Sequence, residues 1–135
     1  MAYQGYLIKV GNYIIPTDKY VKADSYSVTR IVQDLDSARD ANGILHRTAL
    51  SHVPHKIEFE TPAMLTNTDM ADLFGNILRN YLIAEERKLM VTAYIPELDD
   101  YVTQEMYMPD TQFTIYGNYQ NKITYNAVRL AFIGY

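Results

Sequence analysis

The sequence has no cysteine, no tryptophan and no long hydrophobic run, and these absences exclude several classes of protein. Without cysteine the chain can form neither a disulfide framework nor a thiolate metal site. No stretch approaches the roughly 18 consecutive apolar residues that a membrane-spanning helix needs. The first residues also lack the basic and apolar regions of a signal peptide. We therefore expect a protein that is made in the cytoplasm and does not insert into a membrane.

Positive charge is also scarce. The chain has 12 Lys and Arg residues against 16 Asp and Glu residues, which gives a formal net charge of −4. Proteins that bind nucleic-acid phosphates usually carry the opposite balance, so we expect no specific nucleic-acid recognition. A length of 135 residues suits one domain. No linker, repeat or low-complexity segment divides the chain, and we predict a single domain over residues 1–135.

Tyrosine is abundant: 13 of the 135 residues are Tyr, whereas only 4 are Phe. Tyr favours β-strands and is enriched at protein interfaces, where its ring packs while its hydroxyl stays hydrated. Two interpretations follow. The tyrosines line half-exposed sheet faces, or they contact other proteins, and both can hold in one protein.

Alternating apolar and polar residues predict strands over much of the chain. Gly11-Asn12 separates two β-prone runs and predicts a hairpin, and Gly117-Asn118 gives the same signal near the C-terminus. Strands with one solvated face are predicted at Lys56–Glu60 and Tyr101–Met108. In contrast, Asp34–Gly43 is rich in turn-forming residues, and we predict an exposed loop there.

One segment predicts an amphipathic helix. Thr66–Asp69 offers a capping-box start, and apolar residues at helical spacing follow it. These residues are Met70, Leu73, Phe74, Ile77, Leu78 and Tyr81. Gly75 within this stripe suggests a close approach to a sheet, and Glu85–Lys88 are predicted to finish the helix. One helix between two β blocks predicts a mainly β fold, either a β-sandwich or an open barrel flanked by a single amphipathic helix.

The only three histidines are His46, His52 and His55, and they are close enough in sequence to raise the question of a metal site. On a strand, positions 46 and 52 share a face, whereas position 55 lies on the other face unless Pro54 breaks the register. Zinc needs three or four converging ligands. We therefore predict ordinary strand and loop histidines, with no metal and no cofactor site.

Asp34, Asp36 and Asp40 invite comparison with a calcium loop, but their spacing is not that of an EF-hand. Arg39 lies among these acids and is expected to pair with them. The sequence contains no nucleophile elbow, phosphate-binding loop, dinucleotide-binding motif or zinc-protease motif. It therefore predicts no catalytic residue, and we expect the acidic segment to be solvated or to face a partner.

Five segments resemble a family of small tail-associated proteins of tailed phages and prophages of Gram-positive bacteria. They are spread over most of the chain: Tyr6–Gly11, Asp34–Arg47, Lys56–Pro62, Tyr107–Asp110 and Ile123–Leu130. The order of β block, helix and β block is similar to the tail-tube fold that tube subunits share with the core of distal tail proteins. The resemblance implies a virion structural protein of the distal tail, baseplate hub or tail tube. It also implies a homo-oligomeric ring, commonly a hexamer, that contacts other tail proteins.

A ring needs contacts between unlike surfaces that close on themselves, and half-exposed tyrosine-rich strands can supply them. The segment Pro16–Gly43 is long for a domain of this size, so we expect it to reach a neighbouring subunit. An acidic surface would also suit a ring that encloses passing DNA. The residues expected at interfaces are Tyr20, Tyr26, Asp34, Asp36, Arg39, Asp40, Arg47, Tyr101 and Tyr107.

Two other functions compete with the structural role. A carbohydrate- or receptor-binding β-sandwich module would use its tyrosines to stack on sugars. A metal-dependent hydrolase would be centred on the three histidines. Assembly state and metal content separate the three hypotheses, because they predict a ring, a monomer with glycan affinity, and a metal-loaded protein respectively.

Overall fold

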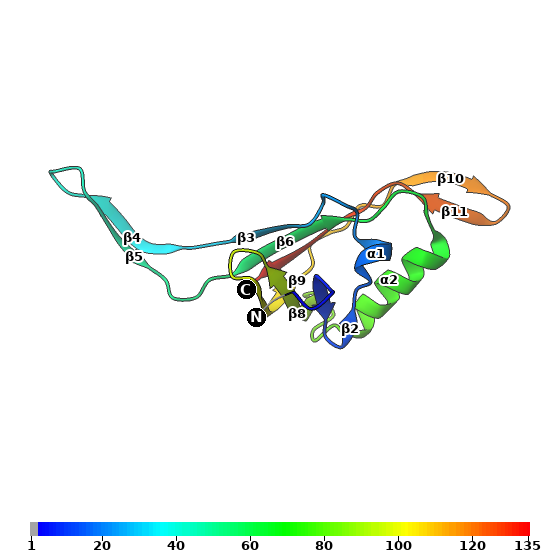
Figure 1. The fold of residues 1–135 in the computed structure, drawn as a ribbon, viewed down its shortest axis with the longest axis horizontal. Coiled ribbons are helices and arrows are strands. Elements are labelled where there is room, and N and C mark those ends of the chain that lie inside the picture. The colour runs from blue at the N-terminus through cyan, green and yellow to red at the C-terminus, as the bar shows by residue number, and fades with distance from the viewer. Residues whose placement is uncertain (1–2) are drawn as a thin grey trace.

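A computed structural model describes residues 3–135, which contain twelve strands and two helices (Figure 1). All strand pairs are antiparallel. Seven strands form one sheet in the order β2-β1-β8-β9-β12-β6-β3. A smaller sheet has the order β10-β11-β7, and β4 and β5 form a two-stranded hairpin. The strands are β1 (Ile8–Val10), β2 (Tyr13–Ile14), β3 (Ser27–Arg30), β4 (Asp34–Arg39), β5 (Leu45–Ala49), β6 (His55–Glu60), β7 (Leu65–Thr66), β8 (Lys88–Ile95), β9 (Asp100–Tyr107), β10 (Ile115–Tyr119), β11 (Lys122–Tyr125) and β12 (Arg129–Gly134). The helices are α1 (Thr17–Tyr20) and α2 (Asn67–Arg79).

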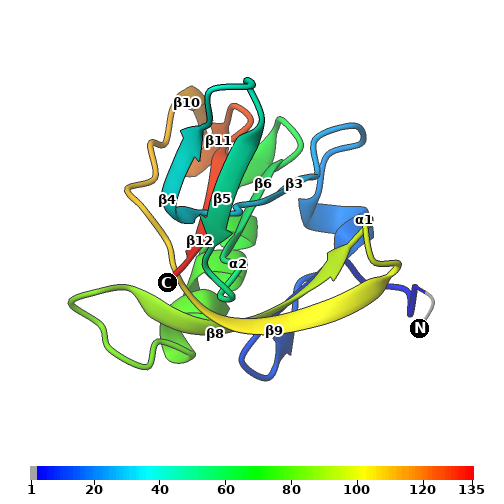
Figure 2. The ribbon, with the colours of Figure 1, turned by 90° about the vertical axis from the view of Figure 1, so that its left-hand side faces the viewer.

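The seven-stranded sheet bends sharply between β9 and β12. These strands pair only where Ile133 meets Tyr107 and Gly134 meets Met106, whereas β8 and β9 pair along their whole length. Figure 2 shows β8 and β9 running across the direction of β6 and β12. The sheet thus wraps around a core but keeps β2 and β3 as free edges, so the described residues form no closed barrel. The prediction of a mainly β fold with open sheets is confirmed.

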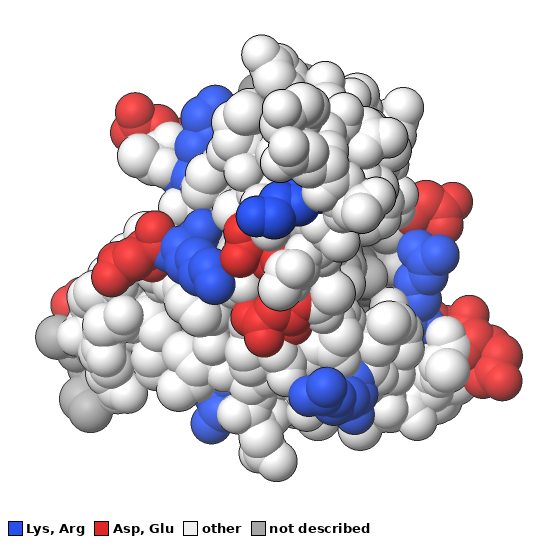
Figure 3. All heavy atoms as spheres, turned by 90° about the vertical axis from the view of Figure 1, so that its right-hand side faces the viewer, with Lys and Arg blue, Asp and Glu red and all other residues white. Residues whose placement is uncertain are grey.

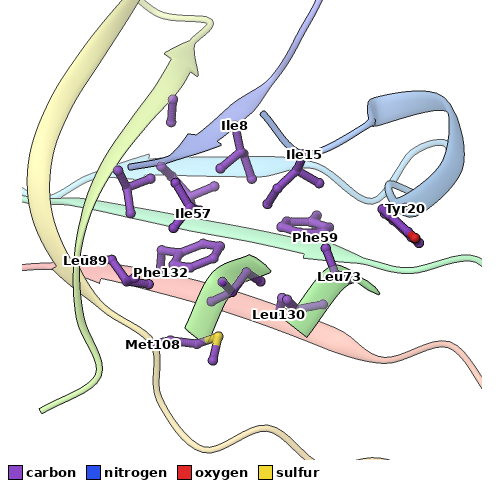
Figure 4. Packing of buried hydrophobic residues seen from close by; sticks show 14 of the residues in the cluster. Ile8, Ile15, Tyr20, Ile57, Phe59, Leu73, Leu89, Met108, Leu130 and Phe132 are labelled. Carbon is purple, nitrogen blue, oxygen red and sulfur yellow. The ribbon is translucent and has the colours of Figure 1, made fainter. Parts of the chain in front are cut away.

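The hydrophobic core lies between the two parts of the bent sheet and helix α2 (Figure 4). Strand β6 contributes Ile57 and Phe59, and β12 contributes Leu130 and Phe132, all of them sealed from solvent. Because alternate residues of a strand face opposite sides, Glu58 between the two buried residues of β6 lies on the outer face. Burying a large apolar side chain stabilises a fold by about 1.5–3 kcal/mol, so this alternation accounts for much of the stability of the body.

Helix α2 begins as predicted but ends earlier. The Thr66 hydroxyl accepts a hydrogen bond from the Asp69 backbone N–H, and the Asp69 carboxylate accepts one from the Thr66 N–H, which completes a capping box. The predicted continuation to Glu85–Lys88 is wrong, because the backbone N–H of Asn80 closes the last turn after Arg79. Neither helix of the described residues is long and apolar enough to cross a membrane.

The apolar stripe of α2 is narrower than predicted. Met70, Leu73 and Ile77 are buried, but Leu78 is 57% exposed. Gly75 has open space where a Cβ would be, so the expected close approach to the sheet is also wrong. The helix therefore covers the core with one row of side chains and leaves the adjoining rows partly in solvent.

Three other local predictions differ from the structure. Thr17–Tyr20 forms the one-turn helix α1, so the described chain has two helices rather than one. Asp34–Gly43 is not a loop, because it forms β4 and the turn that leads to β5. The last hairpin reverses at Gln120-Asn121, where both residues have positive φ as a two-residue turn requires. The predicted turn residues Gly117-Asn118 instead lie inside β10, next to a bulge.

The predicted hairpin at Gly11-Asn12 is confirmed, with Val10 paired to Tyr13. Gly11 has a φ of +58°, and a Cβ on it would lie only 2.3 Å from the side-chain oxygen of Asn80. The same oxygen accepts a hydrogen bond from the backbone N–H of Asn12 at 3.3 Å. Glycine fits here because it tolerates positive φ and lets the hairpin approach the end of α2.

Candidate protein interface

A long two-stranded ribbon leaves the sheet between β3 and β6. We call Val32–His52 the arm and the remaining described residues the body; the arm contains β4 and β5 and projects from one end of the molecule (Figure 1). Every residue of the arm is exposed. An isolated two-stranded hairpin is at best marginally stable in water. The arm therefore has no core of its own and gains stability when another surface covers it.

Charged side chains hold the two strands of the arm in register. Arg47 of β5 donates hydrogen bonds from Nε and Nη2 to the Asp34 carboxylate at 2.8–3.1 Å. His46 pairs with Asp40 at 2.9 Å, and this hydrogen bond is the largest cause of the lowered pKa of Asp40. The backbone N–H of Ile44 also donates to Asp40 and helps to lower its pKa. Exposed ion pairs contribute little to stability, so these contacts shape the arm more than they stabilise it.

Apolar side chains also lie along the arm, with no core to cover them. Leu35 is 72% exposed and Ile44 is 58% exposed, and Val32, Leu45 and Leu50 are exposed as well. Strands β4 and β5 pair only with each other, so each has one free edge. Exposed apolar side chains beside unpaired strand edges are typical of surfaces that bind another chain.

A second hairpin, β10–β11, projects from the opposite end of the molecule (Figure 1). At its root the Phe113 ring packs with centroid distances of 5.0 Å to Phe74 of α2 and 6.1 Å to Tyr125 of β11. Farther out the side chains are uncovered: Tyr116 is 65% exposed and Tyr119 is 76% exposed. This end faces the viewer in Figure 3, where the protruding upper part shows mostly uncharged atoms. The molecule thus has at each end a projecting hairpin with exposed apolar side chains.

Five of the nine predicted interface residues lie together on the arm. They are Asp34, Asp36, Arg39, Asp40 and Arg47. The expectation that Arg39 pairs with these acids is wrong, because its guanidinium donates instead to the carbonyl of Gly43 in the turn. The four predicted tyrosines lie elsewhere, in the body.

Tyr20 lies in the core and has no exposed surface to offer a partner. Its hydroxyl donates a hydrogen bond to the Asp72 carboxylate at 2.7 Å. Burial, with this hydrogen bond and the nearby charge, raises the pKa of Tyr20 well above its usual value. Tyr20 of α1 is therefore hydrogen-bonded to α2, and the spacing of residues in the sequence does not predict this contact.

The other three predicted tyrosines are half-buried and hold parts of one subunit together. The Tyr26 hydroxyl donates to the carbonyl of Tyr94 at 2.7 Å. Tyr101 stacks on Tyr6 at a centroid distance of 4.8 Å and donates to the carbonyl of the same residue. Tyr107 packs edge-on against another tyrosine ring. These contacts agree with the interpretation that the tyrosines line half-exposed sheet faces. A role of the same tyrosines in contacts between subunits stays a prediction.

Sequence reasoning does not single out the most exposed apolar residues of the two hairpins. These are Leu35, Ile44, Tyr116 and Tyr119. A single apolar residue in a segment rich in turn formers gives no sign of the direction in which its side chain points. The turn signal at Gly117-Asn118 does place a chain reversal near the two tyrosines, and that signal directs attention to the second hairpin.

The three histidines do not converge. His46 lies on the arm, His52 at the end of the arm is hydrogen-bonded to the carbonyl of Tyr135, and His55 is buried at the start of β6. Among residues 3–135, no three His, Asp or Glu side chains are placed to hold a metal ion. The geometry thus gives no support to a hydrolase centred on these histidines.

A shallow cavity of about 470 Å³ lies over the outer face of β6 and β12, and Lys22, Glu58, Glu60 and Arg129 are among the residues that line it. Four of its five charged residues are paired: Lys22 lies 3.9 Å from Glu60, and Arg129 donates to Glu58, whereas Asp24 forms no ion pair within the described residues. The bond from Arg129 is the largest cause of the lowered pKa of Glu58. Because most of these charges are already compensated, the cavity offers little attraction to a charged ligand.

Residues 1–135 match the family of unknown function DUF6711, and the chain belongs to this family. A search of the curated proteins finds no match. The function of this family is not established, so membership in it does not by itself assign a function to the chain.

Two solved chains are similar to this one in structure. The first is from the tail of an empty GTA particle with C6 symmetry: the TM-score is 0.52, the sequence identity is 17%, and the match covers 99% of this chain and 95% of that chain. The second is from the virion of a native gene transfer agent (GTA) particle, with a TM-score of 0.52, 15% identity, and coverage of 100% and 94%. At this identity the likeness shows a shared fold.

Proposed function

We propose that this protein is a structural subunit of a phage tail or a related tail-like particle, and that it acts through contacts with neighbouring subunits rather than as an enzyme. The arm is the observation that carries the proposal, because all residues of Val32–His52 are exposed and several of them are apolar. A ribbon of this kind is best explained as a contact element, since it adds little stability to a free monomer. The fold shared with a GTA tail chain supports the same role.

In this proposal identical copies form a ring, with six as the expected number, at the distal end of the tail, in the baseplate hub or in the tube. The similar chain comes from a tail with C6 symmetry, which supports a six-fold arrangement. A ring encloses a channel, and a net charge of −4 suits the passage of DNA because a basic wall would bind phosphate. The protein would then be a virion component that also contacts other tail proteins.

Shortening the arm tests this function. The backbone N–H of Leu50 donates to the carbonyl of Gln33 at 2.8 Å at the base of the arm. Residues 34–49 can therefore be replaced by Asn-Gly, a pair that closes two-residue hairpins. We expect the full chain to form rings in negative-stain images and to show an oligomer mass in light scattering. The shortened chain should stay monomeric and keep the melting temperature of the body.

Two results would count against the proposal, the first against the arm as the contact and the second against the structural role itself. Rings formed equally well by the shortened chain would show that the arm is not the contact. A full chain that stays monomeric at high concentration and binds glycans would favour the carbohydrate-binding alternative. The melting temperature of the shortened chain is the control, because it shows whether lost assembly comes from the missing arm or from an unfolded body.

A further inference from the structure

The most exposed large apolar side chains of residues 3–135 are divided between the two projecting hairpins. Ranked by exposure they are Tyr119, Leu35, Tyr116 and Ile44, so two lie on β10–β11 and two on the arm. Each hairpin also offers a free strand edge: β10 ends the three-stranded sheet, and both strands of the arm are unpaired on one side. Each end thus has both elements of a β-type contact, apolar side chains and unpaired backbone groups.

The two hairpins lie at opposite ends of one extended β layer. Strands β3 and β6 lead into the arm at one end, while β6 and β12 continue at the other end as β7 and β11, which carry β10 (Figure 1). A contact between unlike ends leaves a free arm on one copy and a free hairpin on the other. The same contact can then be repeated by further copies, as heterologous assembly requires.

The charges of the two ends are complementary. On the arm three aspartates outnumber Arg39 and Arg47, and the Asp36 carboxylate has no ion-pair partner within the described chain. Lys122 is the only charged residue between Ile115 and Tyr125, and it too has no ion-pair partner among the described residues. An arm placed on another arm would bring together two surfaces that each have one more Asp than Arg, whereas an arm placed on β10–β11 brings Asp36 near a free cation.

We propose that the arm of one copy docks on the β10–β11 hairpin of the next copy, so that copies associate head to tail. Leu35 and Ile44 of the arm are covered by Tyr116 and Tyr119 of the hairpin, and Asp36 lies near Lys122 of the neighbour. The inference rests on the proposed structural role and adds the surface that receives the arm.

The chain has no cysteine, so no native thiol competes with an introduced one in a crosslinking test. Three variants are needed: Asp36→Cys on the arm, Lys122→Cys on the hairpin, and Asp18→Cys on the exposed side of α1 as a matched control. Equal amounts of the arm variant and the hairpin variant are mixed and treated with a short bismaleimide, and dimers are quantified on a denaturing gel. Light scattering of the same mixtures reports assembly before crosslinking.

We expect the mixture of arm and hairpin variants to give several-fold more crosslinked dimer than either variant alone or either variant mixed with the Asp18→Cys control. A chain with both Asp36→Cys and Lys122→Cys should give a ladder of trimers and larger products, since each copy then has two unlike reactive ends. An arm variant that crosslinks to itself as well as to the hairpin variant would overturn the head-to-tail contact. So would an assembled mixture whose dimer yield stays at the control level, although the structural role itself would then stand.

A charge exchange provides a second readout that does not depend on crosslink geometry. Asp36→Lys and Lys122→Asp should each weaken self-association several-fold, and the two substitutions in one chain should restore most of it because the pair is re-formed with opposite polarity. A double variant that self-associates as weakly as the single variants would contradict the pairing of Asp36 with Lys122. A wild-type chain that is monomeric in light scattering, together with arm and hairpin cysteine variants that give no crosslink above the control, would overturn the head-to-tail contact and the structural role together.

Discussion

In the body, strand β6 buries Ile57 and Phe59 against β12, whereas in the arm β4 and β5 expose every residue on both faces. Both regions consist of antiparallel strand pairs, with one register shift in the arm between Asp34 and Asp36, so strand pairing alone does not account for the difference. The difference is the apolar area removed from water, which is large in the body and nearly absent in the arm. We therefore expect the body to fold on its own and the arm to depend on a second surface for its stability.

The largest expected effect comes from a pair of matched leucine substitutions. Leu130→Ala removes a fully buried side chain of β12 and should lower the free energy of unfolding by about 2–5 kcal/mol. Leu35→Ala removes an exposed side chain of the arm and should change it by less than about 0.5 kcal/mol. Urea unfolding of the monomeric protein measures both values. Equal losses of unfolding free energy in the two variants would show that the arm packs on the body, and the arm and the body would then not differ in burial.

Two glycines give the next comparison, since Gly11 in the body and Gly43 in the arm both have positive φ. Gly11→Ala adds a clash with Asn80 to the backbone strain and should cost about 1–3 kcal/mol. A Cβ on Gly43 meets nothing within 4 Å, and the strain it causes is confined to the turn of the arm. Thermal melts should therefore shift clearly for Gly11→Ala and remain at the wild-type temperature for Gly43→Ala. A melt lowered by Gly43→Ala would mean that arm and body unfold together.

A third pair compares two aspartates whose pKa values are lowered mainly by hydrogen bonds: Asp69 in the capping box and Asp40 in the arm turn. Asp69→Asn should destabilise the body at pH 7 by about 0.5–1 kcal/mol through the weaker start of α2. Asp40→Asn should leave the unfolding of the body unchanged. Urea unfolding of each variant at neutral pH measures this difference.

The pH dependence sharpens the same test. Because the pKa of Asp69 is lowered on folding, its contribution is present above the ordinary carboxyl pKa of about 4 and is lost as the pH falls through the lower folded value. The gap in stability between the wild type and Asp69→Asn should therefore close as the pH falls below about 4. A gap that stays constant over this range would show that the carboxylate charge does not stabilise the helix.

Burial determined how far the sequence could predict the structure. The hairpin at Gly11-Asn12, the alternation in β6 and the start of α2 were predictable, because buried faces and caps impose strict residue patterns. The ribbon at Asp34–Arg39 was predicted as a loop, since a strand with both faces in water needs no alternation of apolar residues. The end of α2 was missed because Leu78 is apolar yet exposed, which makes the helical stripe look longer than the buried row.

The candidate interface shows the same limit. An interface is predicted at the acidic segment from its composition and length; the structure places five of the predicted residues on the exposed arm, and their contact with a partner stays a prediction. Tyr20 was predicted for the same surface, but its ring is needed in the core next to α1. The second hairpin was not predicted as an interface, because its tyrosines resemble those on any half-solvated strand. Only the fold shows that they are uncovered and stand at the end opposite the arm.

Hydrogen exchange of the free and the assembled protein tests most directly whether the arm is a contact element carried by an independently stable body. Amides of β6, β8 and β12 should exchange slowly in both states, because they are buried in the sheet. Amides of residues 34–49 within the arm should exchange quickly in the monomer and become protected on assembly. Slow exchange of the arm in the monomer, or fast exchange of the arm within the assembly, would contradict this division of the molecule.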